Sequence, residues 1–194
     1  MIKYVTFLIF IFLLSCHHPK YKNPHVVINT TFGEIELELF PAQAPKSVAA
    51  FLSYVDAGYY KNSALYRVQN NENVPREYNS GLIQGGIYTT NSRLLQTIPG
   101  LPHESTKQTH LSHTSGAVSL ARTTPGTAST EFFICIGDQL QFDSNETNNL
   151  DQVGYATFAK VFEGMDVVSN IQNAPSHYDA FKKDILIINI ERLQ

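Results

Sequence analysis

The chain of 194 residues carries little charge, and no long block of charge of one sign. Charged residues make up 16% of it, and the formal net charge is −3. A protein that binds nucleic acid through its phosphates normally presents a concentrated basic surface. We therefore expect no nucleic-acid partner. Internal repeats and low-complexity tracts are also missing, while 43% hydrophobic residues are typical of a globular domain.

Cysteine is scarce, with only Cys16 and Cys135 in the chain. Cys135 lies inside the apolar run 132–136, where a small buried side chain is the natural interpretation. If Cys16 is modified, no disulfide can form within the chain.

No apolar run is long enough to span a bilayer. The longest, Tyr4–Leu14, has roughly 11 residues, against the roughly 20 that a membrane-spanning helix needs. A lysine before such a run and a small residue after it are typical of a secretory signal. The ending Leu13-Leu14-Ser15-Cys16 resembles a bacterial lipobox, in which Cys16 would receive the lipid. The alternative is an ordinary signal peptide with a chance cysteine.

This N-terminus predicts three regions and a location. Residues 1–15 form the lipoprotein signal peptide, residues 16–24 a polar tether, and residues 25–194 the folded domain. The location is the bacterial cell envelope, facing the periplasm or on the outer membrane. His17, in place of an acidic residue after Cys16, favours the outer membrane by analogy with lipoprotein sorting.

The folded domain opens with a hairpin. Residues 25–29 and 34–39 are strand-like and flank a turn at 31–33. In the second strand three glutamates alternate with aliphatic residues, so one face of the strand is exposed to solvent and the other is buried. Further strands are predicted at 64–69, 81–87, 116–122, 131–137, 155–162 and 184–193.

Two segments have helical periodicity. After Pro45, apolar residues at 48, 51, 52 and 55 form one stripe, and Gly58 marks the stop. A second, shorter helix is predicted at 165–171. About eight strands and two helices, without regular β–α–β alternation, predict a mainly β protein: a closed eight-stranded antiparallel β-barrel capped by two α-helices. Residues 88–115 and 143–154 are long irregular stretches, which are uncommon unless functional.

Four segments, in order, resemble the signature of one protein family. They are 65–68 (Leu-Tyr-Arg-Val), 82–86 (Leu-Ile-Gln-Gly-Gly), 116–134 and 154–168. The family is the cyclophilin-type peptidyl-prolyl cis-trans isomerases, and residues 103–109 together with Glu131 resemble its bacterial branch. The resemblance covers residues 25–193. It implies the same barrel, a groove on the barrel's outer surface, and rotation about X–Pro peptide bonds (rotamase activity) without metal or organic cofactor.

The resemblance also implies roles for individual residues. Arg67 matches the catalytic arginine, which donates a hydrogen bond to the prolyl nitrogen of a twisted amide. Gln84 matches a groove glutamine that binds the substrate backbone, and Phe133 matches the floor of the proline pocket. The remaining expected substrate-binding residues are Tyr66, Leu82, Ala121, Arg122, Glu131, Phe142 and Tyr155.

The sequence departs from the family pattern at several of these places. Gly81 stands where a phenylalanine is usual, so one wall of the proline pocket lacks a ring. Tyr66 replaces a histidine, Gln141 replaces an aromatic residue, and residues 69–80 are longer and more polar than expected. These departures leave open how tight the pocket is and whether cyclosporin-like macrocycles bind.

Three functions follow from these observations. The first is an isomerase that assists the folding of envelope proteins, with proline-containing polypeptides as clients and the membrane as partner through the lipid on Cys16. The second is a non-catalytic binding or chaperone module of the same fold, and the third a structural lipoprotein. We expect a monomer. His110 and His113 have a spacing compatible with zinc, but no neighbouring ligands complete a set, so no metal is expected.

Overall fold

The computed structural model describes residues 21–70, 75, 79–144 and 152–193. The predicted signal peptide, Cys16 and the first part of the tether lie outside these residues. In the part that the model describes, no helix is long and apolar enough to cross a membrane.

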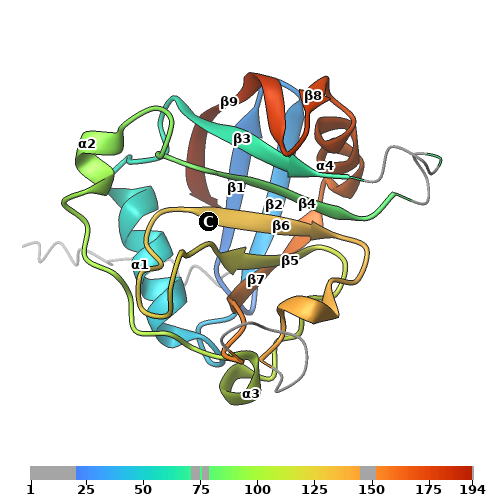
Figure 1. The fold of residues 1–194 in the computed structure, drawn as a ribbon. Helices are drawn as coiled ribbons and strands as arrows, with labels where there is room; N and C mark the ends of the chain where they lie inside the picture. The colour runs from blue at the N-terminus through green and yellow to red at the C-terminus, as the bar shows by residue number, and fades with distance from the viewer. Residues whose placement is uncertain (1–20, 71–74, 76–78, 145–151, 194) are drawn as a thin grey trace, which may run out of the picture.

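The described strands form one antiparallel sheet that closes into a barrel (Figure 1). The strand order is β1-β2-β7-β5-β6-β4-β3-β9, and β9 pairs back with β1 to close the ring. A short ninth strand, β8, adds only a hairpin to β9. The closed eight-stranded barrel is therefore confirmed. The strands are β1 (His25–Thr30), β2 (Gly33–Leu39), β3 (Ser63–Gln69), β4 (Gly81–Gly86), β5 (Ala117–Leu120), β6 (Phe132–Ile136), β7 (Ala156–Glu163), β8 (Ser176–His177) and β9 (Ala180–Leu193).

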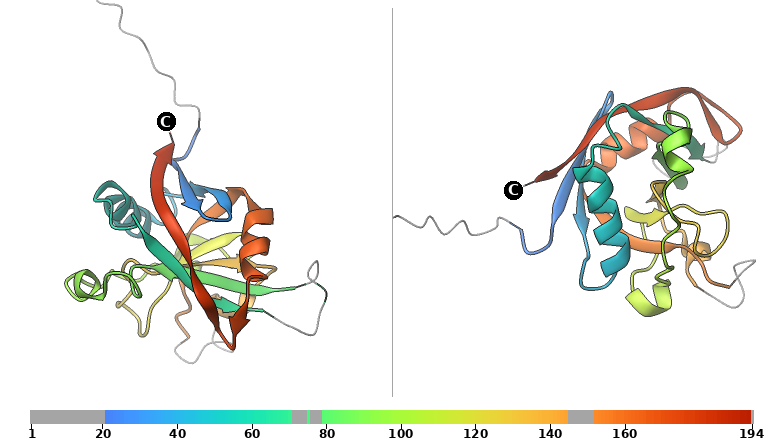
Figure 2. Two further views of the ribbon diagram at one scale, coloured as in Figure 1. Left: turned by 90° about the horizontal axis from the view of Figure 1, so that it is seen from above. Right: turned by 90° about the vertical axis from the view of Figure 1, so that its left-hand side faces the viewer.

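Both predicted helices are present, on opposite sides of the barrel (Figure 2): α1 (Pro45–Asp56) and α4 (Met165–Gln172). The described residues contain more helix than expected. The single turns α2 (Ser92–Leu95) and α3 (Thr106–Thr109) lie in the stretch predicted to be irregular, and the 3-10 turn η2 (Leu140–Phe142) precedes the second such stretch. One turn is too short to show an apolar period, so local caps define it instead, as the capping box of Ser105 and Gln108 does for α3.

The segment 103–109 also supports the first long helix. The buried carboxylate of Glu104 accepts hydrogen bonds from the backbone N–H groups of Lys46 (3.1 Å) and Ser47 (2.8 Å), and from the Ser47 hydroxyl (2.7 Å). These N–H groups belong to the first turn of α1, where no intrahelical acceptor exists and negative charge is favourable. A loop distant in sequence thus caps α1, whose own N-cap residue, Ala44, makes no side-chain cap.

Successive residues on the strands face opposite sides of the barrel wall. Phe132 packs inside, where its ring contacts Phe51 of α1 and Tyr60. Phe133 lies outside, in a small buried cluster with Leu82, Ala117 and Cys135. The expected division between Phe132 and Phe133 is confirmed, as is burial of Cys135. Burial raises the pKa of the Cys135 thiol to about 12, so this cysteine is inert.

A β-bulge on β3 changes this alternation at one place. Leu65 pairs with Gly85, and Arg67 pairs with the next residue of β4, Gln84, so Tyr66 is the extra residue. Strict alternation would place Tyr66 and Arg67 on opposite faces. Because a bulge re-aims the side chains around it, both reach the outer surface, while Leu65 stays in the barrel core.

Candidate active site

A groove of about 610 Å³ lies on the outer surface of the barrel, over β3, β4 and β6. Every site residue that the sequence predicted in the folded domain lines it. Sequence reasoning did not point to its other lining residues, three of which lie in the irregular stretch 88–115 and three between β5 and β6. The predicted lining residues are Tyr66, Arg67, Leu82, Gln84, Ala121, Arg122, Glu131, Phe133, Phe142 and Tyr155, and the others are Gln69, Tyr88, Leu95, Ile98, Thr123, Thr127 and Ser129.

Three aromatic rings and Leu82 form an apolar pocket within the groove. The ring of Phe133 lies 5.3 Å from that of Tyr155 and 5.6 Å from that of Phe142, both edge to face. Phe142 and Tyr155 are 5.5 Å apart, again edge to face. Phe133 comes from β6 and Phe142 from η2, and Tyr155 immediately precedes β7. Because each ring packs against the other two, the pocket is built before any ligand arrives.

A chain of hydrogen bonds runs along the polar side of the groove. Arg67 donates from Nη1 to Oε1 of Gln84 at 3.2 Å, and Gln84 Nε2 donates to the Tyr66 hydroxyl at 2.8 Å. Tyr66 in turn donates to Oε2 of Glu131 at 2.8 Å. Burial and the adjacent Glu131 raise the pKa of Tyr66, so its hydroxyl remains protonated. Tyr66 therefore fixes which way the Gln84 amide points, with its oxygen toward Arg67.

The carboxylate of Glu131 accepts hydrogen bonds from other groups of the protein. Its Oε1 accepts hydrogen bonds from the backbone N–H groups of Ile87 (2.7 Å) and Tyr88 (3.1 Å), in addition to the bond from Tyr66 to Oε2. Burial raises the pKa of Glu131, and these hydrogen bonds oppose that shift. The side chain borders the groove, but its oxygens connect β6 to the chain that follows β4.

Ala121 and Arg122 lie just beyond the end of β5, which stops at Leu120 rather than at residue 122. The Ala121 N–H still bonds to the Glu131 carbonyl at 2.8 Å, so the ladder continues for one step. The Arg122 guanidinium donates from Nε (3.1 Å) and Nη2 (2.5 Å) to the Gly154 carbonyl and lies 4.9 Å from the Tyr155 ring centre. Arg122 thus holds the backbone before Tyr155 and packs against its ring while itself lining the groove.

Two departures from the family pattern have a structural counterpart. Gly81 has a φ of +143°, and a Cβ there would lie 2.1 Å from the Gln69 carbonyl oxygen. No larger side chain fits this backbone. The backbone path of β4 therefore excludes an aromatic residue at position 81. Gln141 bonds to Gln139 at 2.8 Å and is not among the groove-lining residues.

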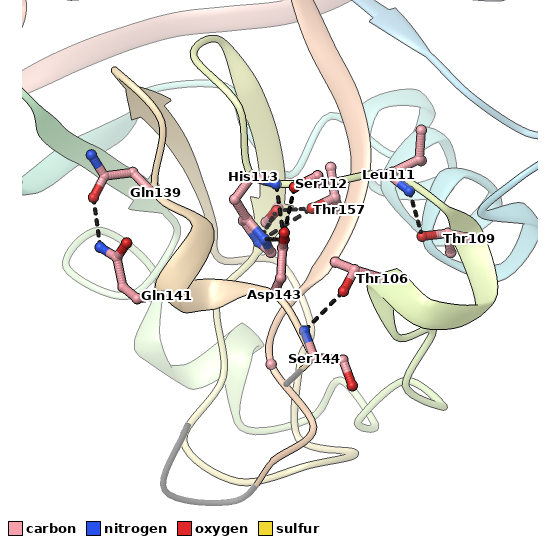
Figure 3. A network of polar contacts seen from close by, with 12 residues as sticks. Thr106, Thr109, Leu111, Ser112, His113, Gln139, Gln141, Asp143, Ser144 and Thr157 are labelled. Carbon is pink, nitrogen blue, oxygen red and sulfur yellow. Dashed lines mark hydrogen bonds and ion pairs between the residues drawn. The ribbon is translucent and has the colours of Figure 1, made fainter. Parts of the chain in front are cut away.

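A network of polar contacts around His113 and Asp143 (Figure 3) lies next to the aromatic pocket. His113, fully buried, has its ring stacked 5.9 Å from Phe133, with Nδ1 2.6 Å from Oδ1 of Asp143. Its Nε2 lies 2.9 Å from the Ser119 hydroxyl and 3.2 Å from that of Thr157. A carboxylate only accepts, so Nδ1 carries the proton and Nε2 accepts. Asp143 follows Phe142, so the network connects the pocket floor to one of its walls.

The sequence did not indicate this role for His113. Asp143 is 30 residues away along the chain, so no local pattern brings the two together. His110, the other histidine of the suggested zinc spacing, is exposed and caps α3 in a left-handed conformation. Among the described residues, no group of three or more His, Cys, Asp or Glu side chains could hold a metal.

The burial of His113 predicts a pH dependence of stability. Burial lowers the pKa of His113 below its usual 6.5, against the opposing effect of Asp143. Below about pH 6.5 the unfolded chain therefore binds a proton that the folded chain does not, so this contribution is complete above that pH and is lost as the pH falls. Urea unfolding at about pH 7.5 and about pH 5.5 should show the loss, which can reach at most about 1.4 kcal/mol one pH unit below the unfolded pKa.

The matched control for the pH experiment is His113→Asn, which cannot titrate. Of the groups facing His113, Asp143 and Tyr155 are titratable, and both remain in the variant. Glu131 acts in the opposite sense, since its folded pKa is raised, so the informative quantity is the difference between the two proteins. An equal acid response in both would contradict the assignment to His113.

Comparisons with known proteins agree with this geometry. The family model for cyclophilin type peptidyl-prolyl cis-trans isomerase/CLD matches residues 25–192. A peptidyl-prolyl cis-trans isomerase of Acinetobacter baylyi is 32% identical over 197 residues, covering 98% of this chain and 96% of the relative. Peptidyl-prolyl cis-trans isomerase B of Escherichia coli is 31% identical over 178 residues, covering 85% and 97%.

A solved structure shares the fold. The crystal structure of a cyclophilin type peptidyl-prolyl cis-trans isomerase of Cryptosporidium parvum has a TM-score of 0.69 and 24% identity, covering 88% of this chain and 98% of that one. The closed barrel is thus a shared fold. The chain belongs to the cyclophilin-type peptidyl-prolyl cis-trans isomerase family and is an isomerase of X–Pro peptide bonds. The resemblance found in the four sequence segments is confirmed.

Proposed function

We propose that the groove binds an extended, proline-containing segment and that Arg67, Gln84 and Phe133 carry the isomerisation. The barrier to rotation about an amide is about 18–20 kcal/mol, because the nitrogen lone pair is shared with the carbonyl. No covalent bond has to break. An enzyme accelerates this step only by binding the twisted amide better than both planar forms.

Arg67 supplies that preference. In the twisted amide the prolyl nitrogen is pyramidal, so its lone pair can accept a hydrogen bond that the planar amide cannot. The Arg67 guanidinium lies at the polar side of the groove, with its side chain partly open to solvent. Gln84 is held beside it by Tyr66 and is placed to bind the substrate backbone.

The aromatic pocket supplies the fixed end of the rotation. Phe133, Phe142, Tyr155 and Leu82 form an apolar site suited to a proline ring. While the ring is held, the peptide on the other side of the amide turns past Arg67. Tyr66, Glu131, Ala121 and Arg122 complete the walls and the edge along which the peptide would lie.

The observation that carries this assignment is the meeting of Arg67 with the aromatic pocket in one groove, from strands distant in sequence. An isomerisation assay on a proline peptide tests it, and Arg67 is the side chain whose removal should matter most. A folded protein that binds the peptide without accelerating isomerisation would support the alternative, a non-catalytic binding module.

We further infer that the enzyme serves the bacterial cell envelope, anchored through a lipid on Cys16. The support is the lipobox-like ending and the topology of the barrel. From β1, the strand next to the tether, β6 is the fourth strand either way: through β2, β7 and β5, or through β9, β3 and β4. β6 bears Phe133, and in Figure 1 it crosses in front of β1 and β2. An anchor attached there leaves the groove clear for client proteins.

The substitution Cys16→Ala tests the anchor. In a bacterial host fed a labelled fatty acid, the wild-type protein should take up label and sediment with membranes, and the variant should do neither. Cys135→Ala is the matched control and should behave as wild type, because Cys135 is buried. Unlabelled, soluble wild-type protein in the periplasm would instead support an ordinary signal peptide.

A further inference from the structure

A carboxylate contacts the guanidinium of Arg67 on the side away from Gln84. Arg67 donates from Nε to Oδ2 of Asp179 at 3.0 Å, while Nη1 donates to Gln84 at 3.2 Å. A guanidinium has five N–H bonds. Two are used by these partners, and Nη2 has no acceptor among the described residues. The group is therefore held from two sides, with N–H bonds left to donate to a substrate.

The turn that carries Asp179 is fixed beside Arg67. Ser176 pairs with Phe181 and His177 with Ala180, so Tyr178 and Asp179 form the tip of the β8–β9 hairpin. The Asp179 carbonyl accepts from the Val68 N–H at 3.0 Å, one residue along β3 from Arg67. Arg67 itself pairs with Ala180. The backbone on both sides of the ion pair is thus hydrogen-bonded together.

The same turn has an unfavourable backbone conformation. Tyr178 has a φ of +54°, in the left-handed region that residues other than glycine rarely adopt, and it is 86% exposed. Its ring contacts only the adjacent His177 ring among the described aromatic contacts. A two-residue hairpin loop requires a positive φ at its first residue, and this turn places Asp179 against Arg67.

Stability does not explain the ion pair. The side chains of Arg67 and Asp179 are 38% and 61% exposed. Ion pairs that exposed contribute little to the stability of a fold. We propose that Asp179 is a positioning residue for the isomerase reaction: its carboxylate holds the Arg67 guanidinium in the orientation that meets the prolyl nitrogen. This inference rests on the role proposed for Arg67.

The geometry predicts how each substitution should act. Asp179→Ala frees the Nε side of the guanidinium, and a reacting group displaced by 1 Å can cost about a hundredfold in rate. Because Gln84 still holds Nη1, we expect a smaller loss, of about tenfold in kcat. KM should be nearly unchanged, because Arg67 contacts the prolyl nitrogen only in the twisted state. Asp179→Asn keeps an oxygen acceptor for Nε–H and should recover most of the rate.

The experiment measures kcat and KM for a proline peptide with the purified full-length protein and its variants. The set is Asp179→Ala, Asp179→Asn, Arg67→Ala, the double variant Arg67→Ala/Asp179→Ala, and Asp184→Ala as an exposed acidic control on β9. If Asp179 acts through Arg67, its removal changes nothing further in the Arg67→Ala background. The Arg67 Nε–H signal in a ¹H–¹⁵N spectrum should be slow to exchange in wild type and lost in Asp179→Ala.

The outcomes separate this inference from the one it rests on. If Arg67→Ala keeps the wild-type rate, the role of Arg67 fails and that of Asp179 fails with it. If Arg67→Ala loses activity while folded Asp179→Ala keeps both its rate and the Nε–H signal, only the positioning role is overturned. The positioning role is also overturned if Asp179→Ala lowers the rate further in the Arg67→Ala background. The substitution would then act through the β8–β9 hairpin and not through Arg67.

Discussion

Replacing Arg67 with alanine should lower kcat/KM for a proline peptide by about 10²–10³-fold, the range found when a preorganised donor to a transition state is removed. Each factor of ten corresponds to about 1.36 kcal/mol of selective stabilisation. In the proposed mechanism Arg67 donates to the prolyl nitrogen at the rotating bond, so the loss should be large, and its partners Gln84 and Asp179 cannot replace it. Protease-coupled or NMR exchange assays measure the rate.

The control for this prediction is Arg67→Lys. Lysine keeps the charge but lacks the planar fork that Gln84 and Asp179 hold, so it should recover little of the rate. Circular dichroism should show both variants folded, since Arg67 is not part of the barrel core. A folded Arg67→Ala variant with wild-type activity would remove Arg67 from the mechanism.

Replacing Phe132 with alanine should lower the free energy of unfolding by about 3–5 kcal/mol, as is typical for a buried phenylalanine. Phe132 is fully buried, and its ring contacts Phe51 and Tyr60 between the barrel and α1. Against a total stability of about 5–15 kcal/mol, this is a severe effect. Chemical denaturation followed by circular dichroism measures it.

Two further variants make the Phe132 result interpretable. Phe32→Ala, in the β1–β2 turn and 44% exposed, should change stability by less than about 1 kcal/mol. Phe133→Ala should reduce isomerase activity, whereas the Phe132→Ala protein that remains folded should retain it, because its side chain faces away from the groove. If Phe132→Ala proved as mild as Phe32→Ala, the inward placement of Phe132 would be wrong.

The architecture and most of the groove could be predicted from the amino-acid sequence. Alternation in residues 34–39 and the helical stripe after Pro45 follow from the two periods of backbone structure, so the hairpin and α1 could be predicted locally. Four ordered segments identified the family and, through it, ten of the residues that line the groove. Sequence also predicted opposite faces for Phe132 and Phe133, because neighbouring residues on a strand must diverge.

Other features depend on contacts between parts of the chain that are distant in sequence. The bulge that lets Tyr66 and Arg67 share one face depends on the register of β3 against β4 and β9, which alternation alone would not predict. Asp143 reaches His113, and Asp179 reaches Arg67, across 30 and 112 residues of chain. Such contacts are set by how the closed barrel brings distant loops together, so no local pattern in the sequence records them.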